Sequence, residues 1–107
     1  NRIENNDFSG IAISDYCFAV EPTPFGCASG NDPSITPEFL ADQAASNNRV
    51  AENVLIDNGT NPIPPDSPFA PVAADLSLLS LGDNGNCYAD NVFTTFFSTL
   101  GILPPCP

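Results

Sequence analysis

Apolar and polar residues alternate over short stretches of this chain, and asparagine recurs between the stretches. One pattern occurs three times, at residues 1–8, 48–55 and 86–93. It consists of Asn, any residue, an apolar residue, two polar or small residues, Asn, any residue and a large apolar residue. The copies begin at positions 1, 48 and 86, which gives offsets of 47 and 38 residues. Period-two alternation indicates strands, and internal repeats are typical of stacked architectures.

Each repeat predicts a pair of short strands. The pairs are expected within residues 1–17 and 49–59, and the third repeat is followed by a stretch rich in β-forming residues at 94–100. Residues 73–81 are apolar, and inside a layered fold they favour a strand over a short helix. The side chains expected to point into the layers are Val50, Val54, Ile56, Leu76, Leu78 and Leu81.

Two insertions interrupt the repeats, at residues 14–47 and 60–75. Both are rich in proline, which excludes central strands. Within the first, Thr36-Pro37-Glu38 has the form of a helix start, with an N-cap, proline at the first helical position and an acid in the first turn. We therefore expect one short helix at 37–45 within a single domain, 1–107.

The repeated asparagines have two expected roles. Asparagine tolerates a positive φ at sharp corners, and its amide can donate to and accept from the asparagine of the next layer. We expect Asn6, Asn53 and Asn91 to occupy one column. The full set expected to form such a ladder is Asn1, Asn6, Asn48, Asn53, Asn86 and Asn91.

The chain contains four cysteines, and no His is available to complete a zinc site. In a short chain, this number of cysteines favours disulfides and an oxidising compartment. Of the three pairings, Cys17–Cys27 and Cys87–Cys106 are preferred because each closes a local loop. The final residues, Leu103-Pro104-Pro105-Cys106-Pro107, are expected to close a sheet edge, since proline cannot donate to a further strand.

The repeat resembles the coil motif of right-handed parallel β-helix proteins, the pectate-lyase-like group. The resemblance lies in Asn1 to Ile11, in residues 48–59 and 86–93, and in the Cys-bearing ending, which is similar to the closing segment of bacterial secreted members. It implies an all-β fold: a short β-helix of about three rungs with loop insertions. The family includes enzymes, adhesins and non-catalytic surface proteins, so the fold does not give the function.

Charge narrows the range of partners. There are 13 acidic residues against two basic ones, Arg2 and Arg49, which gives a formal net charge of −11. Such a chain lacks the cations that bind nucleic acid or anionic membranes. No apolar run approaches the ~20 residues of a membrane span. The two arginines occupy the same repeat position, and are expected to stack on one face and pair with Glu4, Glu52 or a neighbouring acid.

Candidate chemistry is sparse. Lys and His are absent, so a lyase base or a Ser-His-Asp set is not available. No cofactor is expected, although the turn Asp83-Asn84-Gly85-Asn86 with Asp90 gathers oxygen ligands that suit calcium. Asn58-Gly59-Thr60 is an N-glycosylation sequon, or simply a turn. A glycosidase needs a pair of carboxylates, and by number alone the candidates are Asp7, Asp15, Asp57, Asp83 and Asp90.

Two functions fit these residues. The first is a non-catalytic, extracellular structural or assembly module, disulfide-tied, that self-associates through an open N-terminal edge into multimers or filaments. The second is the C-terminal part of a carbohydrate-active enzyme or a carbohydrate-binding surface protein, with Tyr16, Tyr88 or a Phe as a platform for polysaccharide. Because the chain opens on a bare repeat, we expect it to be a processed chain or a piece of a longer one.

Overall fold

The computed structural model describes residues 1–20, 37–62, 64–67 and 69–107. Strands dominate this part of the chain, as expected of an all-β protein. They are short, which agrees with the spacing of turn-forming residues between the apolar stretches. In chain order, the elements are β1 (Arg2–Glu4), β2 (Ser9–Ser14), α1 (Tyr16–Val20), α3 (Pro37–Gln43), β3 (Arg49–Ala51), β4 (Val54–Ile56), the 3₁₀ helix η1 (Ala70–Val72), β5 (Ala74–Leu79), β6 (Cys87–Ala89) and β7 (Phe96–Ser98).

The strands form three sheets, and every pairing between them is parallel. Strand β1 pairs with β4, β3 pairs with β6, and β5 lies between β2 and β7. Isolated parallel bridges extend two of the sheets by one step, from Val54 to Val92 and from Tyr88 to Pro105. From β3 onward, the chain visits the three sheets in the same order twice, so consecutive passes lie upon one another.

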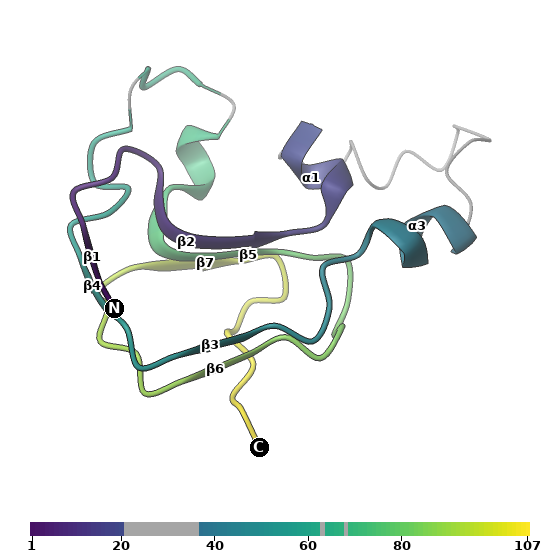
Figure 1. Cartoon of the computed structure of the whole chain (residues 1–107). Helices are drawn as coiled ribbons and strands as arrows, with labels where there is room; N and C mark the ends of the chain where they lie inside the picture. The colour runs from purple at the N-terminus through teal and green to yellow at the C-terminus, as the bar shows by residue number, and fades with distance from the viewer. Residues whose placement is uncertain (21–36, 63, 68) are drawn as a thin grey trace.

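The three sheets lie on three sides of a shared interior (Figure 1). One hydrophobic cluster fills it, with members from all three sheets: Ile13, Val50, Leu55, Leu76, Leu78 and Tyr88. Leu76 is fully buried at 0% exposure, as expected for the centre of the middle strand of the largest sheet. The apolar faces of three narrow sheets therefore share one core, because none of them is wide enough to bury its own face.

The expected inward side chains are only partly correct. Val50, Leu76 and Leu78 are buried, but Leu81 is 43% exposed because β5 ends at Leu79. In β4, Leu55 is buried at 2% while Val54 is 37% exposed. The predicted facing of β4 was thus wrong by one residue, and a one-residue shift exchanges the two faces of a strand.

Two short helices flank the sheet β2–β5–β7 at one end (Figure 1). The helix expected at 37–45 is confirmed as α3. Helix α1 was not predicted; it begins after Asp15, whose backbone carbonyl accepts a hydrogen bond from the N–H of Phe18. Phe18 is 1% exposed and packs with Cys17 and Leu79 in a second, smaller cluster. Helix α1 therefore covers part of the outer face of this sheet.

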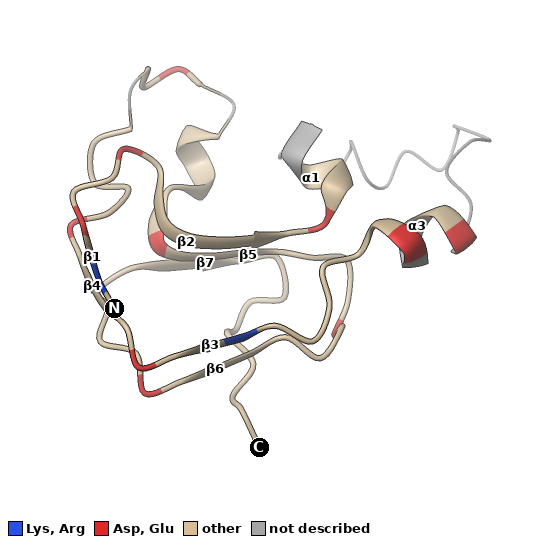
Figure 2. Cartoon of the chain, viewed as in Figure 1, with Lys and Arg blue, Asp and Glu red and all other residues tan. Residues whose placement is uncertain are grey.

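Charged residues lie mostly at the corners between strands and on α3 (Figure 2). Arg2 pairs in register with Val54, whereas Arg49 pairs with Cys87 in a different sheet. The expectation that the two arginines stack on one face was therefore wrong. Arg2 does form the expected ion pair with Glu4, at 3.2 Å and exposed to solvent. No helix in the described part of the chain has the length and apolar character of a membrane span.

Candidate functional site

The recurring asparagines form hydrogen-bonded columns that join one layer of strands to the next. In the first column, the side-chain amide of Asn1 donates to Oδ1 of Asn53 at 3.2 Å. The backbone N–H and the side-chain amide of Asn53 then both donate to Oδ1 of Asn91, at 3.1 and 3.0 Å. Asn53 and Asn91 therefore stack as expected, but Asn1, not Asn6, stands above them.

Asn6 belongs to a second column. Its backbone N–H and side-chain amide donate to Oδ1 of Asn58 at 3.1 and 2.9 Å. Asn58 repeats the arrangement, donating through both groups to Oδ1 of Asp75 at 3.0 Å. The first two repeats are thus offset by 52 residues along the chain rather than by the expected 47.

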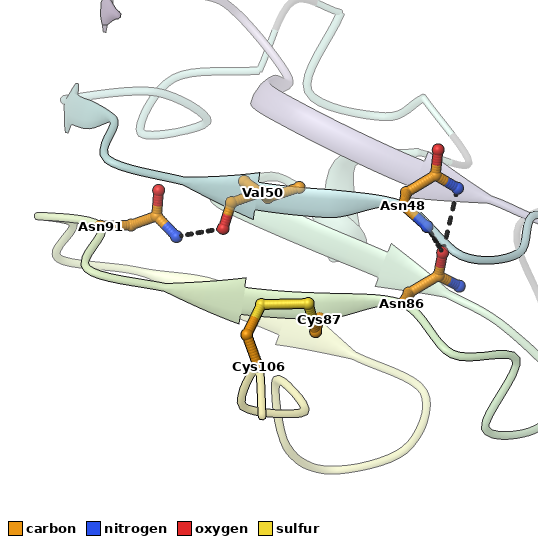
Figure 3. Close-up of a disulfide and its surroundings, with 6 residues drawn as sticks. All are labelled: Asn48, Val50, Asn86, Cys87, Asn91 and Cys106. Atoms are coloured by element: carbon orange, nitrogen blue, oxygen red, sulfur yellow. Dashed lines mark hydrogen bonds between the residues drawn. A yellow bond between two sulfur atoms is a disulfide. The ribbon is translucent and has the colours of Figure 1, made fainter.

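A third column links Asn48 to Asn86, again through the backbone N–H and the side-chain amide, both at 3.0 Å (Figure 3). The lower asparagine of a step returns a bond to the layer above. Asn86 donates to the carbonyl of Ala45 at 2.7 Å, and Asn91 donates to that of Val50 at 2.9 Å. Such repeated two-way bonding satisfies the backbone at the corners, where no strand partner is available.

The positive-φ corner residues are not the ladder asparagines themselves. Positive φ angles of 55° to 59° occur at Asn5, Asn47, Glu52, Asp57 and Asp90, each directly before a ladder asparagine. Gly85 has the same place before Asn86. The expected link between asparagine and positive φ was therefore misplaced by one residue: the preceding residue makes the corner, and the asparagine makes the ladder.

Asp75 ends the second column as an acceptor only. One carboxylate oxygen accepts the two bonds from Asn58, and the other accepts the backbone N–H groups of Thr94 and Thr95 at 2.9 and 3.3 Å. Burial alone raises the pKa of this carboxyl, but the hydrogen bonds from Thr94, Asn58 and Thr95 outweigh it, so the pKa lies below its ordinary value of 3.8. Asp75 is 1% exposed, so it acts as an internal brace.

Asp15 plays a similar bracing role at the end of β2. Its carboxylate accepts the backbone N–H groups of Ala45 and Leu81 at 3.0 and 3.1 Å. These bonds tie the segment after α3 and the turn after β5 to the same strand. Since its oxygens are engaged and the side chain is 1% exposed, Asp15 is not placed to act as one of a pair of glycosidase carboxylates.

The disulfide Cys87–Cys106 is confirmed, with a Cα–Cα distance of 4.7 Å (Figure 3). It holds the proline-rich ending against β6. The N–H of Tyr88 donates to Pro104, and the N–H of Cys106 donates to Tyr88, at 2.8 and 3.2 Å. Cys17 lies in α1, whereas Cys27, its predicted partner, lies outside the described residues.

The residues proposed for calcium are spread over one strand and its flanking turns. Asp83 accepts the N–H of Gly85 within the turn, and Asn84 donates to Ser80. Asn86 precedes β6 and is buried, while Asp90 follows the other end of that strand. Among the described residues, no three acidic or cysteine side chains are grouped closely enough to hold a metal ion.

The sequon at Asn58 is closed to modification in the folded protein. Asn58 is 0% exposed, and its side-chain nitrogen donates to both Ile3 and Asp75. A glycan attached there has no room. The predicted ladder did not include Asn58 or Asp75. Asn58 could have been found, because it continues the five-residue spacing of Asn48 and Asn53.

The aromatic residues considered as sugar platforms differ in accessibility. Tyr16 is 62% exposed, but Tyr88 is 7% exposed and lies in the core. Burial raises the pKa of the Tyr88 hydroxyl to about 12, and this hydroxyl has no hydrogen-bond partner among the described residues. Tyr88 therefore cannot present its ring to a polysaccharide. Phe93 and Phe96 are 38% and 48% exposed and meet edge to face, with ring centroids 6.2 Å apart.

Two cavities in the described part of the chain have mainly apolar walls. One, of about 310 Å³, lies against the sheet β2–β5–β7, with apolar walls from Phe8, Phe69, Val72 and Leu79. None of its lining residues is charged, so it offers no group for acid–base chemistry. The other, of about 170 Å³, is bounded by Tyr88, Phe93 and Leu103.

The most distinctive arrangement in the described chain is therefore a polar scaffold: three directional columns, a brace at each end of the largest sheet and one cross-linked edge. It positions strands rather than reactive groups. Comparison with protein-family models, with curated proteins and with solved structures gives no match for this chain.

Proposed function

We propose that the stacked parallel strands are rungs of a right-handed parallel β-helix, and that the chain is a non-catalytic structural module. Its role is to join another layer of strands through the outer edges of β1, β2 and β3. The support is the layered parallel register, the asparagine columns and a core shared by the three sheets. The disulfide fits an oxidising environment, so we place the module outside the cell.

The observation that carries the proposal is the state of these three edges. Each of β1, β2 and β3 has a strand partner on one side only within the described part of the chain. All three edges belong to the same end of the stack, since each is the first strand of its sheet. Unpaired parallel edges of this kind are templates for strand addition.

Single backbone groups on these edges can be identified. Asn5 donates its N–H to Ile56, and Val54 donates to Asn1, which fixes the alternation along β1. The N–H of Glu4 therefore points away from β4, toward the open edge. By the same alternation, Cys87 donates to Asn48 and Glu52 donates to Ala89, so the N–H of Ala51 faces outward from β3.

Proline at these two positions tests the proposal. Glu4→Pro and Ala51→Pro each remove one outward N–H and leave the hydrogen bonds to β4 and β6 in place. Proline is tolerated on edge strands for this reason. The matched controls Glu4→Gln and Ala51→Val keep the N–H. We expect the parent chain and the controls to show concentration-dependent association by analytical ultracentrifugation, and both proline variants to show less of it.

Circular dichroism must show the same fold in all five proteins. A parent chain that remains monomeric up to millimolar concentration at moderate salt contradicts the proposal. Association that the proline variants retain in full also contradicts it, because the contact then lies elsewhere on the surface.

A further inference from the structure

The asparagine columns have a direction, and this direction restricts how a second layer can join. At each Asn-to-Asn step with paired bonds, the backbone N–H and the side-chain amide of one residue donate to Oδ1 of the next. The open edge is formed by Asn1, Asn6 and Asn48. Their side-chain amides follow this pattern and donate into the chain, to the next asparagine of each column. No described group donates to their Oδ1 atoms, so the open edge ends in three side-chain acceptors.

The other end of the first column has the complementary groups. Asn91 gives one side-chain hydrogen to the carbonyl of Val50. Its backbone N–H and its second side-chain hydrogen have no acceptor among the described residues. Asn91 thus ends the column with two unused donors, and Asn1 begins it with an Oδ1 atom that accepts no hydrogen bond. Asn91 of a neighbouring copy could therefore donate to Oδ1 of Asn1, as Asn53 donates to Oδ1 of Asn91 within the chain.

Resting on the proposed function, we infer that the partner at the open edge is a second copy of this chain, added head to tail, with Asn91 of one copy above Asn1 of the next. A head-to-head pair places acceptor against acceptor in all three columns, and the two facing oxygens repel each other and are both left without a donor. The head-to-tail pair continues the parallel direction of every strand. Because it is heterologous, it does not close, and it grows into open chains.

The strand register gives the contacts that such a joint makes. Arg2 pairs with Val54, which bridges to Val92, so Val92 of one copy lies over Arg2 of the next. In the largest sheet, Ile11 pairs with Leu76 and Leu76 with Phe96, so Phe96 lies over Ile11. Val92 and Phe96 are 64% and 48% exposed in the single chain, and the joint covers this apolar surface.

Two features limit the strength of the joint. The ending that lies on β6 contains Pro104, Pro105 and Pro107, and none of these prolines has an N–H group to donate to a further strand. The net charge of −11 on each copy opposes association. Salt screens this repulsion, so the joint strengthens as ionic strength rises.

Paired variants, each with one added cysteine, test the orientation. Adjacent strands bring Cα atoms within the 4.4–6.8 Å range that a disulfide requires. Arg2→Cys and Val92→Cys are oxidised alone and as an equimolar mixture at a concentration at which the parent chain associates. Asp66→Cys, in an exposed loop, serves as the control for random cross-linking in mixtures with each.

We expect a band at twice the 11.2 kDa chain mass in the mixture of Arg2→Cys with Val92→Cys. The same band should be absent from every single-variant and control sample. The double variant should give a series of higher multiples. Cross-linking of Arg2→Cys with itself at least as efficient as in the mixture indicates the head-to-head pair and overturns the inference. Failure of the mixture to cross-link while the parent chain associates also overturns it. A parent chain that does not associate removes the proposed function, and this inference with it.

Discussion

The carboxylate of Asp75 is the most informative single group to perturb, because one side chain holds two layers together. Its two oxygens accept four hydrogen bonds, two from Asn58 and one each from the N–H groups of Thr94 and Thr95. Asp75→Asn keeps the size and shape of the side chain. It retains one oxygen for one pair of donors and turns an NH₂ group toward the other pair.

The cost follows from these contacts. An asparagine that keeps its oxygen toward Asn58 leaves the N–H groups of Thr94 and Thr95 facing another donor. Each buried donor left without a partner costs roughly 1–3 kcal/mol, so we expect Asp75→Asn to lower the free energy of unfolding by about 3 kcal/mol. Urea unfolding followed by circular dichroism at pH 7 measures this change. Asp66→Asn, which makes the same charge change in an exposed loop, is the matched control.

The dependence on pH gives an independent test of the same group. The pKa of Asp75 in the folded protein lies below its ordinary value. The charged form therefore stabilises the fold at pH values above the unfolded-state pKa, and this contribution is lost as the pH falls through the folded-state pKa. The parent chain should lose more stability than Asp75→Asn on acidification from pH 5 to pH 2. A cost below about 1 kcal/mol at pH 7, or the same acid response in both proteins, refutes the bracing role of Asp75.

Three further changes test the core, the cross-link and the corners. Leu76→Ala should cost about 3 kcal/mol in urea unfolding, because the side chain is fully buried; Leu81→Ala, at an exposed site, should change little, and equal losses would place the core elsewhere. Replacing Cys87 and Cys106 together by Ser opens a loop with a sequence separation of 19 and should cost about 3 kcal/mol, seen as a lower Tm; an unchanged Tm contradicts this. Glu52→Asn should raise the unfolding free energy by roughly 0.5–1 kcal/mol, because Glu52 has a φ of 58° and asparagine accepts this region at less cost; a loss in a calorimetric scan would argue against corner strain.

The register of the repeats shows how far the sequence could lead. The five-residue spacing predicts the ladder, and the ladder is present. However, this spacing occurs twice in succession in the middle of the chain, from Asn48 to Asn53 and from Asn53 to Asn58. Asn1 can therefore align with either Asn48 or Asn53. The structure uses the second alignment, which places Asn6 on Asn58 rather than on Asn53.

The errors in facing have a similar local origin. Three apolar residues in a row, Val54, Leu55 and Ile56, carry no alternation from which to choose a buried face. The choice falls on Leu55, which pairs in register with Ile3 at the interior. Asp75 was also not predicted in the ladder. Its role depends on donors from Asn58 and Thr94, and only the folded structure brings these groups to its carboxylate.

Parallel stacking also sets how this chain must reach its folded state. Asn48 and Asn86 stand 38 residues apart in sequence, and Asn1 and Asn53 stand 52 apart. None of the described strands pairs with its immediate neighbour along the chain, so no hairpin can form early and guide the others. Each sheet contact must first close a long loop, and chains dominated by such distant contacts fold slowly, in milliseconds to seconds. During that interval the apolar strands stay unprotected, so refolding yield should fall steeply as protein concentration rises.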